Sequence, residues 1–104
     1  MEFDPRNVRK GLAFGLRRAL PTFEQIRIES HQLEEFSSNV ARLVETTLRA
    51  WPTDLSPRFV VLYSELVTTA ALARAINKEA PLTPDDAMAF LGHAASFLNS
   101  FKHK

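Results

Sequence analysis

The sequence has 104 residues, 45% of them hydrophobic, and its 13 lysines and arginines nearly balance 12 acidic residues, leaving a net charge of +1. This length suits one small domain, the hydrophobic content excludes an intrinsically disordered chain, and the charge argues against a protein that mainly coats nucleic acid. The absence of cysteine excludes disulfides, thiolate catalysis and cysteine-built zinc sites. No hydrophobic run approaches the roughly 18 residues of a membrane span, and the N-terminal stretch lacks the apolar core of a secretory signal. We therefore expect a cytoplasmic protein with no membrane partner.

The first predicted helix covers residues 5–20. Asp4 is suited to cap it, and proline is favoured in the first helical turn that follows. Apolar residues recur on one face and five cations occupy the others, namely Arg6, Arg9, Lys10, Arg17 and Arg18. Gly11 and Gly15 each weaken the helix by about 1 kcal/mol relative to alanine. Their spacing permits, without requiring, a close approach of another backbone.

The longest predicted helix covers residues 22–51, where neither glycine nor proline interrupts the chain before Pro52. Thr22 and Gln25 have the spacing of a capping box at its start. A seven-residue apolar repeat predicts a narrow seam that another helix would cover. At 1.5 Å per residue this helix would be about 45 Å long, which exceeds a compact domain of this size. We therefore expect a second copy of the chain to cover the overhanging part, giving a homodimer.

Two further helices are predicted over residues 57–79 and 84–101. Each begins with a capping residue followed by proline, the capping residues being Ser56 and Thr83. Short proline-marked corners join the helices, so neighbours should run antiparallel. The predicted fold is all-α: a short N-terminal helix, one long helix and two further helices in a dimeric antiparallel helical bundle, with residues 1–104 forming a single domain.

Catalytic and cofactor-binding motifs are not apparent in the sequence. Three glycines in total leave no glycine-rich phosphate loop, and no G-x-S-x-G motif is present. The best titratable cluster is His31 with Glu34 and Glu35 on one helix face, but it lacks the second copy that a ferritin-like metal site requires. A solvated helix face explains the cluster more simply. We predict no enzyme activity, no cofactor and no metal site.

Aromatic residues are the sharpest remaining feature, with eight phenylalanines in the chain. Aromatic side chains dominate the energetics of cores and interfaces, and the length of the long helix implies that some apolar residues lie at an interface. The predicted dimer interface comprises Phe23, Ile26, Leu33, Val40, Val44 and Trp51. The predicted partner-binding residues are Phe36, Leu43, Phe90, Leu91, Phe97, Leu98 and Phe101. The sequence thus predicts association with other proteins.

The cations of the first helix allow an alternative function, a small DNA-associated regulator. Five positive charges within thirteen residues could contact phosphates. Pro21 and the acidic stretch 24–35 follow, however, where a helix–turn–helix would have a short glycine turn and a base-reading helix. We therefore expect no direct nucleic-acid partner. Docking of the same face on an acidic protein or on a membrane surface stays open.

Three stretches of the chain resemble the small QslA-like antiactivators of LuxR-type quorum-sensing regulators. They are MEFDPRNVRKGLAFGLRRALP, FEQIRIESHQLEEFSSNVARLVETTLRAWP and DDAMAFLGHAASFLNSFKHK. The order of a short basic helix, a leucine-proline corner and a long helix ending in proline is also similar to that of the TraM antiactivators. The resemblance covers the layout of the whole chain, but it supplies no signature motif from which roles of individual residues could be carried over.

The resemblance implies a partner and a mechanism. The partner would be the ligand-binding domain of a LuxR-type, LasR-like transcription regulator, bound at the surface through which that domain dimerises. A regulator that cannot dimerise cannot hold a two-fold symmetric operator, because half-site spacing requires two linked subunits. By mass action, the regulator would act only once it outnumbers its antagonist. This mechanism requires apolar helix faces and neither a cofactor nor a catalytic residue.

Overall fold

The computed structural model describes residues 3–19, 29–51 and 54–102, the final stretch 97–102 as helical backbone only. Within these ranges the chain is α-helical and contains no strand. The helices are α1 (Pro5–Ala19), α2 (Ser30–Arg49), α3 (Pro57–Ile76) and α4 (Pro84–Lys102). The predicted all-α class with four helices is confirmed.

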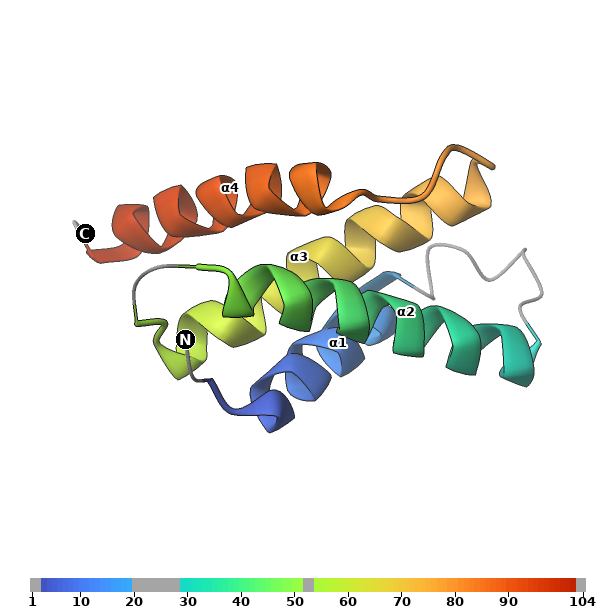
Figure 1. Ribbon diagram of the computed structural model, residues 1–104, viewed down its shortest axis with the longest axis horizontal. Helices are drawn as coiled ribbons and strands as arrows, with labels where there is room; N and C mark the ends of the chain where they lie inside the picture. The colour runs from blue at the N-terminus through green and yellow to red at the C-terminus, as the bar shows by residue number, and fades with distance from the viewer. Residues whose placement is uncertain (1–2, 20–28, 52–53, 103–104) are drawn as a thin grey trace.

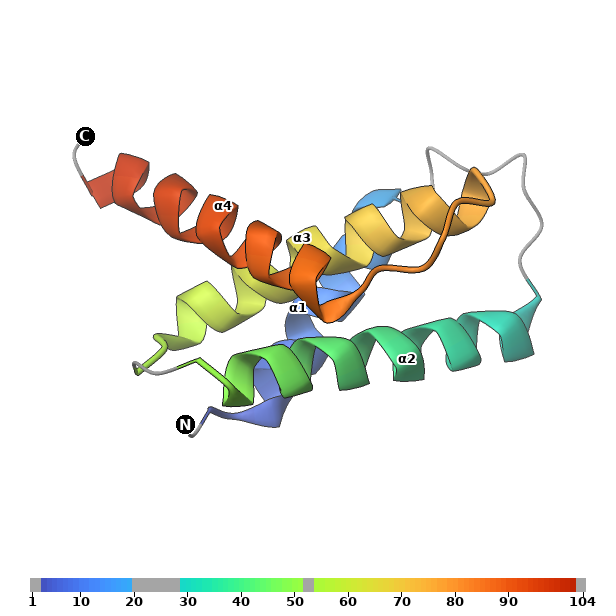
Figure 2. The same cartoon turned by 45° about the horizontal axis from the view of Figure 1, so that its top comes forward.

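The other three helices pack around α3, which contacts each of them and packs most extensively against α1. In Figure 1, α2 runs from right to left, α3 returns from left to right, and α4 runs leftward again. Figure 2 shows α4 diverging from α3 towards its C-terminal end. The molecule measures 39 × 29 × 24 Å along its principal axes.

Local capping explains where three of the helices begin. Asp4, Ser56 and Thr83 each accept a side-chain hydrogen bond from a backbone N–H of the turn that follows, with donor–acceptor distances of 2.9, 3.1 and 3.2 Å. These side chains satisfy amide groups that lack a partner within the helix. The starts predicted for these three helices are therefore confirmed.

The predicted continuous helix over 22–51 is corrected by the structure, because α2 begins at Ser30 and ends at Arg49. Glu29 has extended backbone angles, φ −71° and ψ 152°, and forms a capping box with Gln32. In that box the Glu29 N–H donates to Gln32 Oε1 at 3.2 Å. The predicted cap at Thr22 lies outside the described residues. A helix of 20 residues is about 30 Å long, shorter than the 39 Å extent of the molecule, so the argument from an overhanging helix no longer holds.

Helix α3 ends at Ile76, three positions before the predicted end, because the chain adopts a left-handed conformation two residues later. Lys78 has φ 57°, and the N–H groups of Lys78 and Glu79 donate to the carbonyl oxygens of Ala75 and Arg74 at 3.3 and 3.0 Å. These two bonds form a Schellman motif, which usually places glycine at the left-handed position. The motif turns the chain towards α4.

Gly11 and Gly15 bring α1 into close contact with α3. A β-carbon at position 11 would overlap the carbonyl oxygen of Val61 and would lie 2.6 Å from Ser64 Cβ. At position 15 it would lie 2.9 Å from Thr68 Cβ. Both glycines are buried, so their missing side chains allow the helix axes to approach closely.

One hydrophobic core joins all four helices. It contains Val8, Leu12, Val40, Val44, Leu48, Phe59, Val60, Tyr63, Val67, Ala87, Leu91 and Ala94. By length and composition α3 is also apolar enough to cross a membrane, but a helix surrounded by others in a core has the same composition. Because α3 touches every other helix, we interpret its hydrophobicity as that of the central helix.

Tyr63 provides the polar link between α3 and α4 inside this core. Its side chain is fully buried, and its hydroxyl donates to the Ala87 carbonyl oxygen at 2.9 Å. Burial raises the pKa of Tyr63 to about 12, opposed by a smaller effect of the Thr47 hydroxyl. The hydroxyl is therefore held as a neutral donor at the junction of α2, α3 and α4.

Candidate functional site

An apolar groove of about 280 Å³ lies between α2, the end of α3 and the segment that leads into α4. Its lining consists of Phe36, Asn39, Val40, Leu43, Ala71, Arg74, Ala75, Glu79, Pro81 and Leu82. A hollow of this size lies at the lower end of ligand pockets, which usually enclose about 300–1,000 Å³, and it admits a few apolar side chains. It is therefore a candidate site for apolar side chains of another molecule.

Residue size explains why a groove forms at this place. Phe36, Val40 and Leu43 are spaced i, i+4 and i+7 and therefore face the same side of α2. The opposite wall, on α3, has the small side chains Ala71 and Ala75, with Arg74 between them turned to the Asp86 carboxylate. Large residues on one helix thus face small ones on the other, and the space between them is left unfilled.

Exposure decides which lining residues a second molecule could reach. Val40 is 4% exposed and forms the floor, while Phe36 and Leu43 are half-buried. Ala75 is exposed at the mouth, and Leu82 is half-buried on the far side. The groove therefore offers accessible apolar surface above a floor that belongs to the core.

The corner between α3 and α4 is held by an ionic and hydrogen-bonding network around Asp86. Its Oδ2 atom accepts from the Thr83 N–H and the Thr83 hydroxyl, both at 3.0 Å, and from Arg74 Nη1 at 3.2 Å. Arg74 Nη1 also donates to the Ala80 carbonyl oxygen at 3.4 Å. The bonds from Thr83, with a smaller contribution from Arg74, hold the pKa of the Asp86 carboxyl below its usual value. These bonds therefore fix the corner between α3 and α4, which forms one side of the groove.

The rim of the groove is polar at two further positions. Asn39 on α2 and Glu79 after α3 are both exposed. A polar rim around an apolar centre is the usual arrangement of protein–protein interfaces. The composition of the groove therefore suits a protein segment better than a small polar ligand.

Of the predicted partner-binding residues whose side chains the structure describes, two line the groove and two do not. Phe36 and Leu43 line the groove, whereas Phe90 lies half-buried against the core with its ring centroid 6.4 Å from that of His93. Leu91 has no exposed surface, which corrects its assignment as a contact residue. Phe97, Leu98 and Phe101 belong to the last turns of α4, where side chains lie outside the described part of the chain.

The predicted dimer interface is corrected at two positions. Val40 is 4% exposed and Val44 is fully buried, so both serve the core of the single chain. Leu33 and Trp51 are half-buried. Phe23 and Ile26 lie outside the described residues. The apolar face of α2 around Val40 and Val44 is thus covered by other helices of the same chain.

Sequence reasoning did not identify the opposite wall of the groove. Ala71 and Ala75 belong to an alanine-rich stretch of α3 that resembles ordinary helix packing, and Pro81 and Leu82 lie in a predicted corner. A comparison of side-chain volumes on facing helices could have indicated a hollow, but it requires knowledge of which helices face each other.

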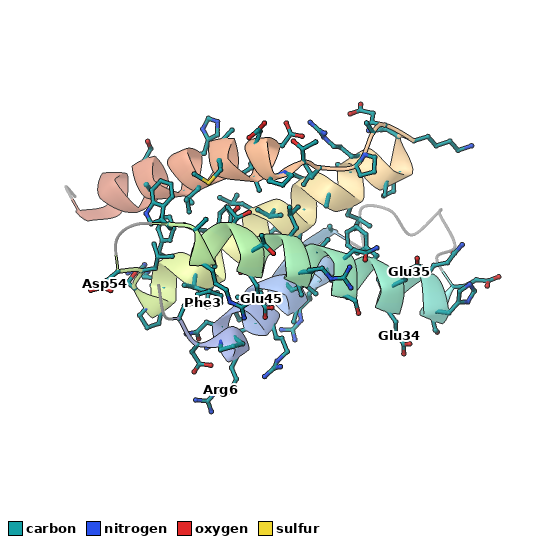
Figure 3. All side chains as sticks on the ribbon, viewed as in Figure 1. Phe3, Arg6, Glu34, Glu35, Glu45 and Asp54 are labelled. Carbon is teal, nitrogen blue, oxygen red and sulfur yellow. The ribbon has the colours of Figure 1, made fainter. Side chains whose placement is uncertain are left out.

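The titratable cluster of α2 does not converge on a metal site. His31 Nδ1 lies 3.3 Å from a Glu29 carboxylate oxygen, and both side chains are exposed. Figure 3 shows Glu34 at the start of α2 pointing away from the other helices. Among residues 3–19, 29–51 and 54–102, no group of three or more potential metal ligands comes together.

Comparisons with protein-family models, with curated proteins and with solved structures found no match to this chain.

Proposed function

We propose that this protein is an antiactivator that binds the ligand-binding domain of a LuxR-type, LasR-like quorum-sensing regulator and blocks its dimerisation. The regulator would then fail to bind its two-fold symmetric operator. The class of partner rests on the sequence resemblance. The observation that carries the docking mechanism is the apolar groove, in which Phe36 and Leu43 present accessible apolar surface beneath a polar rim.

The groove suits one part of the regulator's dimerisation surface. Helix recognition in grooves commonly uses two or three apolar anchors on one face of a helix. A volume of about 280 Å³ accommodates such anchors, and burial of each would contribute roughly 1.5–3 kcal/mol. Anchors of the regulator that occupy the groove would be unavailable to a second regulator subunit.

The homodimer stays a prediction and has lost its geometric argument, since α2 does not exceed the length of the molecule. Leu33 and Trp51 are the members of the predicted interface that retain exposed surface in the described residues. Sedimentation of the purified protein at micromolar concentration tests it. A monomer at that concentration would contradict the dimer and leave the groove mechanism intact.

A gel-shift titration with the purified regulator tests the antiactivator function. The protein alone should leave operator DNA unshifted, and it should remove the shift made by the regulator as their ratio approaches equality. Ala75→Glu places a carboxylate at the mouth of the groove on an exposed residue and should weaken this effect at least about tenfold, because burial of an unpaired charge is costly.

Ala89→Glu is the matched control, since Ala89 is also an exposed helical alanine but lies on α4 outside the groove lining. It should antagonise the regulator like the wild type. Equal activity of the Ala75→Glu variant would contradict the groove as the docking site. A direct, strongly salt-dependent shift of DNA by the protein alone would favour the DNA-associated alternative.

A further inference from the structure

The outward face of α1 is densely basic and contains no acidic residue. Its exposed residues are Pro5, Arg6, Arg9, Lys10, Ala13, Phe14, Arg17 and Arg18. Helix α1 lies along the lower edge of the molecule in Figure 1, and Figure 3 shows the Arg6 side chain reaching away from the body there. The five cations of the first helix are thus all directed to solvent.

The close packing of α1 on α3 fixes the orientation of this face. Gly11 and Gly15 are buried against α3, and a side chain at either position would collide with it. Val8 and Leu12 belong to the shared core. Because α1 cannot rotate without breaking these contacts, its basic side stays outward.

Two of the five cations are engaged in ion pairs with other residues. Arg6 Nη2 lies 2.9 Å from Asp4 Oδ2, and Arg18 Nη1 lies 3.2 Å from Oε1 of Glu65 on α3. The side chains of both arginines remain highly exposed, 80% and 77%. Pairs this exposed contribute little stability and are readily exchanged for other anions.

Arg9 and Lys10 are exposed and form no salt bridge within the described part of the chain. They lie one helical turn before Phe14, and Arg17 lies one turn after it. The α1 face therefore holds cations on both sides of one aromatic ring.

Phe14 is the unusual member of this face. It is 38% exposed, one of the two large hydrophobic residues exposed to this degree in the described residues. The Arg17 guanidinium carbon lies 6.0 Å from the ring centroid, and the ring borders a shallow hollow with Arg17, Arg18 and Glu65. An exposed ring among cations matches a surface that offers anions and hydrocarbon together.

In contrast to the sequence-based expectation of no membrane partner, we propose that the outward face of α1 binds the surface of a bilayer that contains anionic phospholipids. The cations would contact the phosphate groups, and the Phe14 ring would enter the interfacial region between them. Clusters of four to eight basic residues on an amphipathic helix are typical of such binding. The apolar side of α1 stays in the protein core, so the contact is shallow, reversible and sensitive to salt.

A nucleic-acid duplex would fit this face less well. Its exposed residues include no serine, threonine, asparagine or glutamine that could contact base edges. A duplex backbone would also offer no hydrocarbon to the Phe14 ring. This proposal is separate from the antiactivator function, since it uses α1 and not the groove.

Sedimentation of the full chain with lipid vesicles tests the proposal. The protein should sediment with vesicles of phosphatidylcholine that contain roughly one quarter phosphatidylglycerol and should stay in solution with pure phosphatidylcholine. Raising NaCl from about 0.1 M to about 0.5 M should release it. Arg9→Gln with Lys10→Gln should lower the partition coefficient about 25-fold, about fivefold for each charge.

Arg42→Gln with Lys78→Gln is the control pair, because it removes the same charge from exposed positions on α2 and after α3. It should bind like the wild type. An equal loss in this pair would overturn the proposal, as would tighter binding to a DNA duplex than to anionic vesicles, or no binding to the anionic vesicles. Ala75→Glu should bind vesicles normally, so failure of the groove mechanism and failure of membrane binding can be told apart.

Entry of the aromatic ring has its own measurement. The wild type contains Trp51 as its single tryptophan, so its emission supplies the background for a Phe14→Trp variant. On addition of anionic vesicles the emission of the variant should move to shorter wavelengths and that of the wild type should not. An unchanged emission of the bound variant would overturn insertion of the ring.

Discussion

The two sides of α3 are packed in opposite ways. Towards α1, Gly11 and Gly15 contribute no side chain, so their backbone lies directly against Val61, Ser64 and Thr68 of α3 with no room for a β-carbon. Towards α2, the small residues Ala71 and Ala75 face the large Phe36 and Leu43, and a groove remains. Small residues allow close packing when the two helices can approach each other. They leave a groove when other contacts keep the helices apart.

The α1-facing side of α3 is used for packing within the chain, whereas part of its α2-facing side is accessible to another molecule. The contact of Gly11 and Gly15 with α3 is closely packed. It can therefore stabilise the fold, but it leaves no space there for another molecule. The groove lacks the contacts that would fill it, so its apolar lining is free for a partner. The same helix thus supplies stability on one side and a candidate binding site on the other.

Gly11→Ala should have the largest effect on stability. The added methyl group would overlap the Val61 carbonyl oxygen, which is backbone and cannot rotate away. We expect a loss of about 3 kcal/mol in the free energy of unfolding, the upper range for overpacking, measured by urea denaturation. Gly92→Ala is the control, because no atom lies within 4 Å of its new methyl group. It should gain up to about 1 kcal/mol from helix propensity. Equal stability of the two variants would contradict the close packing of Gly11 against α3.

Tyr63→Phe should weaken the junction of α3 with α4 by about 1 kcal/mol at neutral pH, since one buried hydrogen bond is lost. The wild type should also lose stability in alkali. The pKa of this tyrosine is near 10 in the unfolded chain and about 12 in the folded one. Between these values the unfolded state releases its proton first, so the free energy of unfolding falls as pH rises, by roughly 2–3 kcal/mol.

Absorbance titration of the single tyrosine measures this pKa directly, and the phenylalanine variant isolates its share of the alkaline loss from that of other groups. A titration midpoint near 10 in the folded protein would contradict the burial of the hydroxyl.

Lys78→Gly should stabilise the protein by about 0.5–1 kcal/mol, because a left-handed conformation costs a residue with a side chain roughly 1–2 kcal/mol and glycine nothing comparable. Lys78 has φ 57° at the turn that leads to the groove wall. Asn77→Gly is the control, since Asn77 has φ −81° and gains nothing from glycine. Thermal unfolding of both variants measures the difference, and a gain that is equal at the two positions would argue against strain at Lys78.

Asp86→Asn should have the smallest effect, visible in acid. Hydrogen bonds from Thr83 and the Arg74 charge lower the pKa of Asp86 below 3.8. A lowered pKa adds stability above the unfolded value, and this stability is lost as the pH falls through the folded value. The variant should therefore unfold with a less steep acid dependence in a circular dichroism titration. Asp85→Asn removes a neighbouring carboxylate that makes none of these bonds, so it is the control for loss of charge alone.

The helix starts were predictable because the capping residues are local signals. Asp4, Ser56 and Thr83 precede their helices in the sequence, and each makes the expected bond. The start of α2 was missed because Glu29 is not a preferred capping residue and neither glycine nor proline marks the position. A long apolar repeat then suggested a helix longer than the one that forms.

The wall of the groove on α2 could be recognised from the sequence. Phe36 and Leu43 follow the periodicity of α2, so the sequence indicates that they share a face. Val40, Val44 and Leu91 follow the same kind of periodicity and are buried. Periodicity identifies an apolar face, but it does not tell whether the same chain or another molecule covers that face.

Composition and local patterning already specify the helical class, three of the four helix starts, and the division of each helix into an apolar and a polar face, since helix propensity, capping and amphipathicity act over a few residues. Packing in three dimensions settles that Gly11 and Gly15 meet α3, and that Ala71 and Ala75 face Phe36 and Leu43 across a gap. Those relations depend on the distances between helices far apart in the chain. The distances follow from the sum of all side-chain volumes in the core and not from any one stretch of sequence.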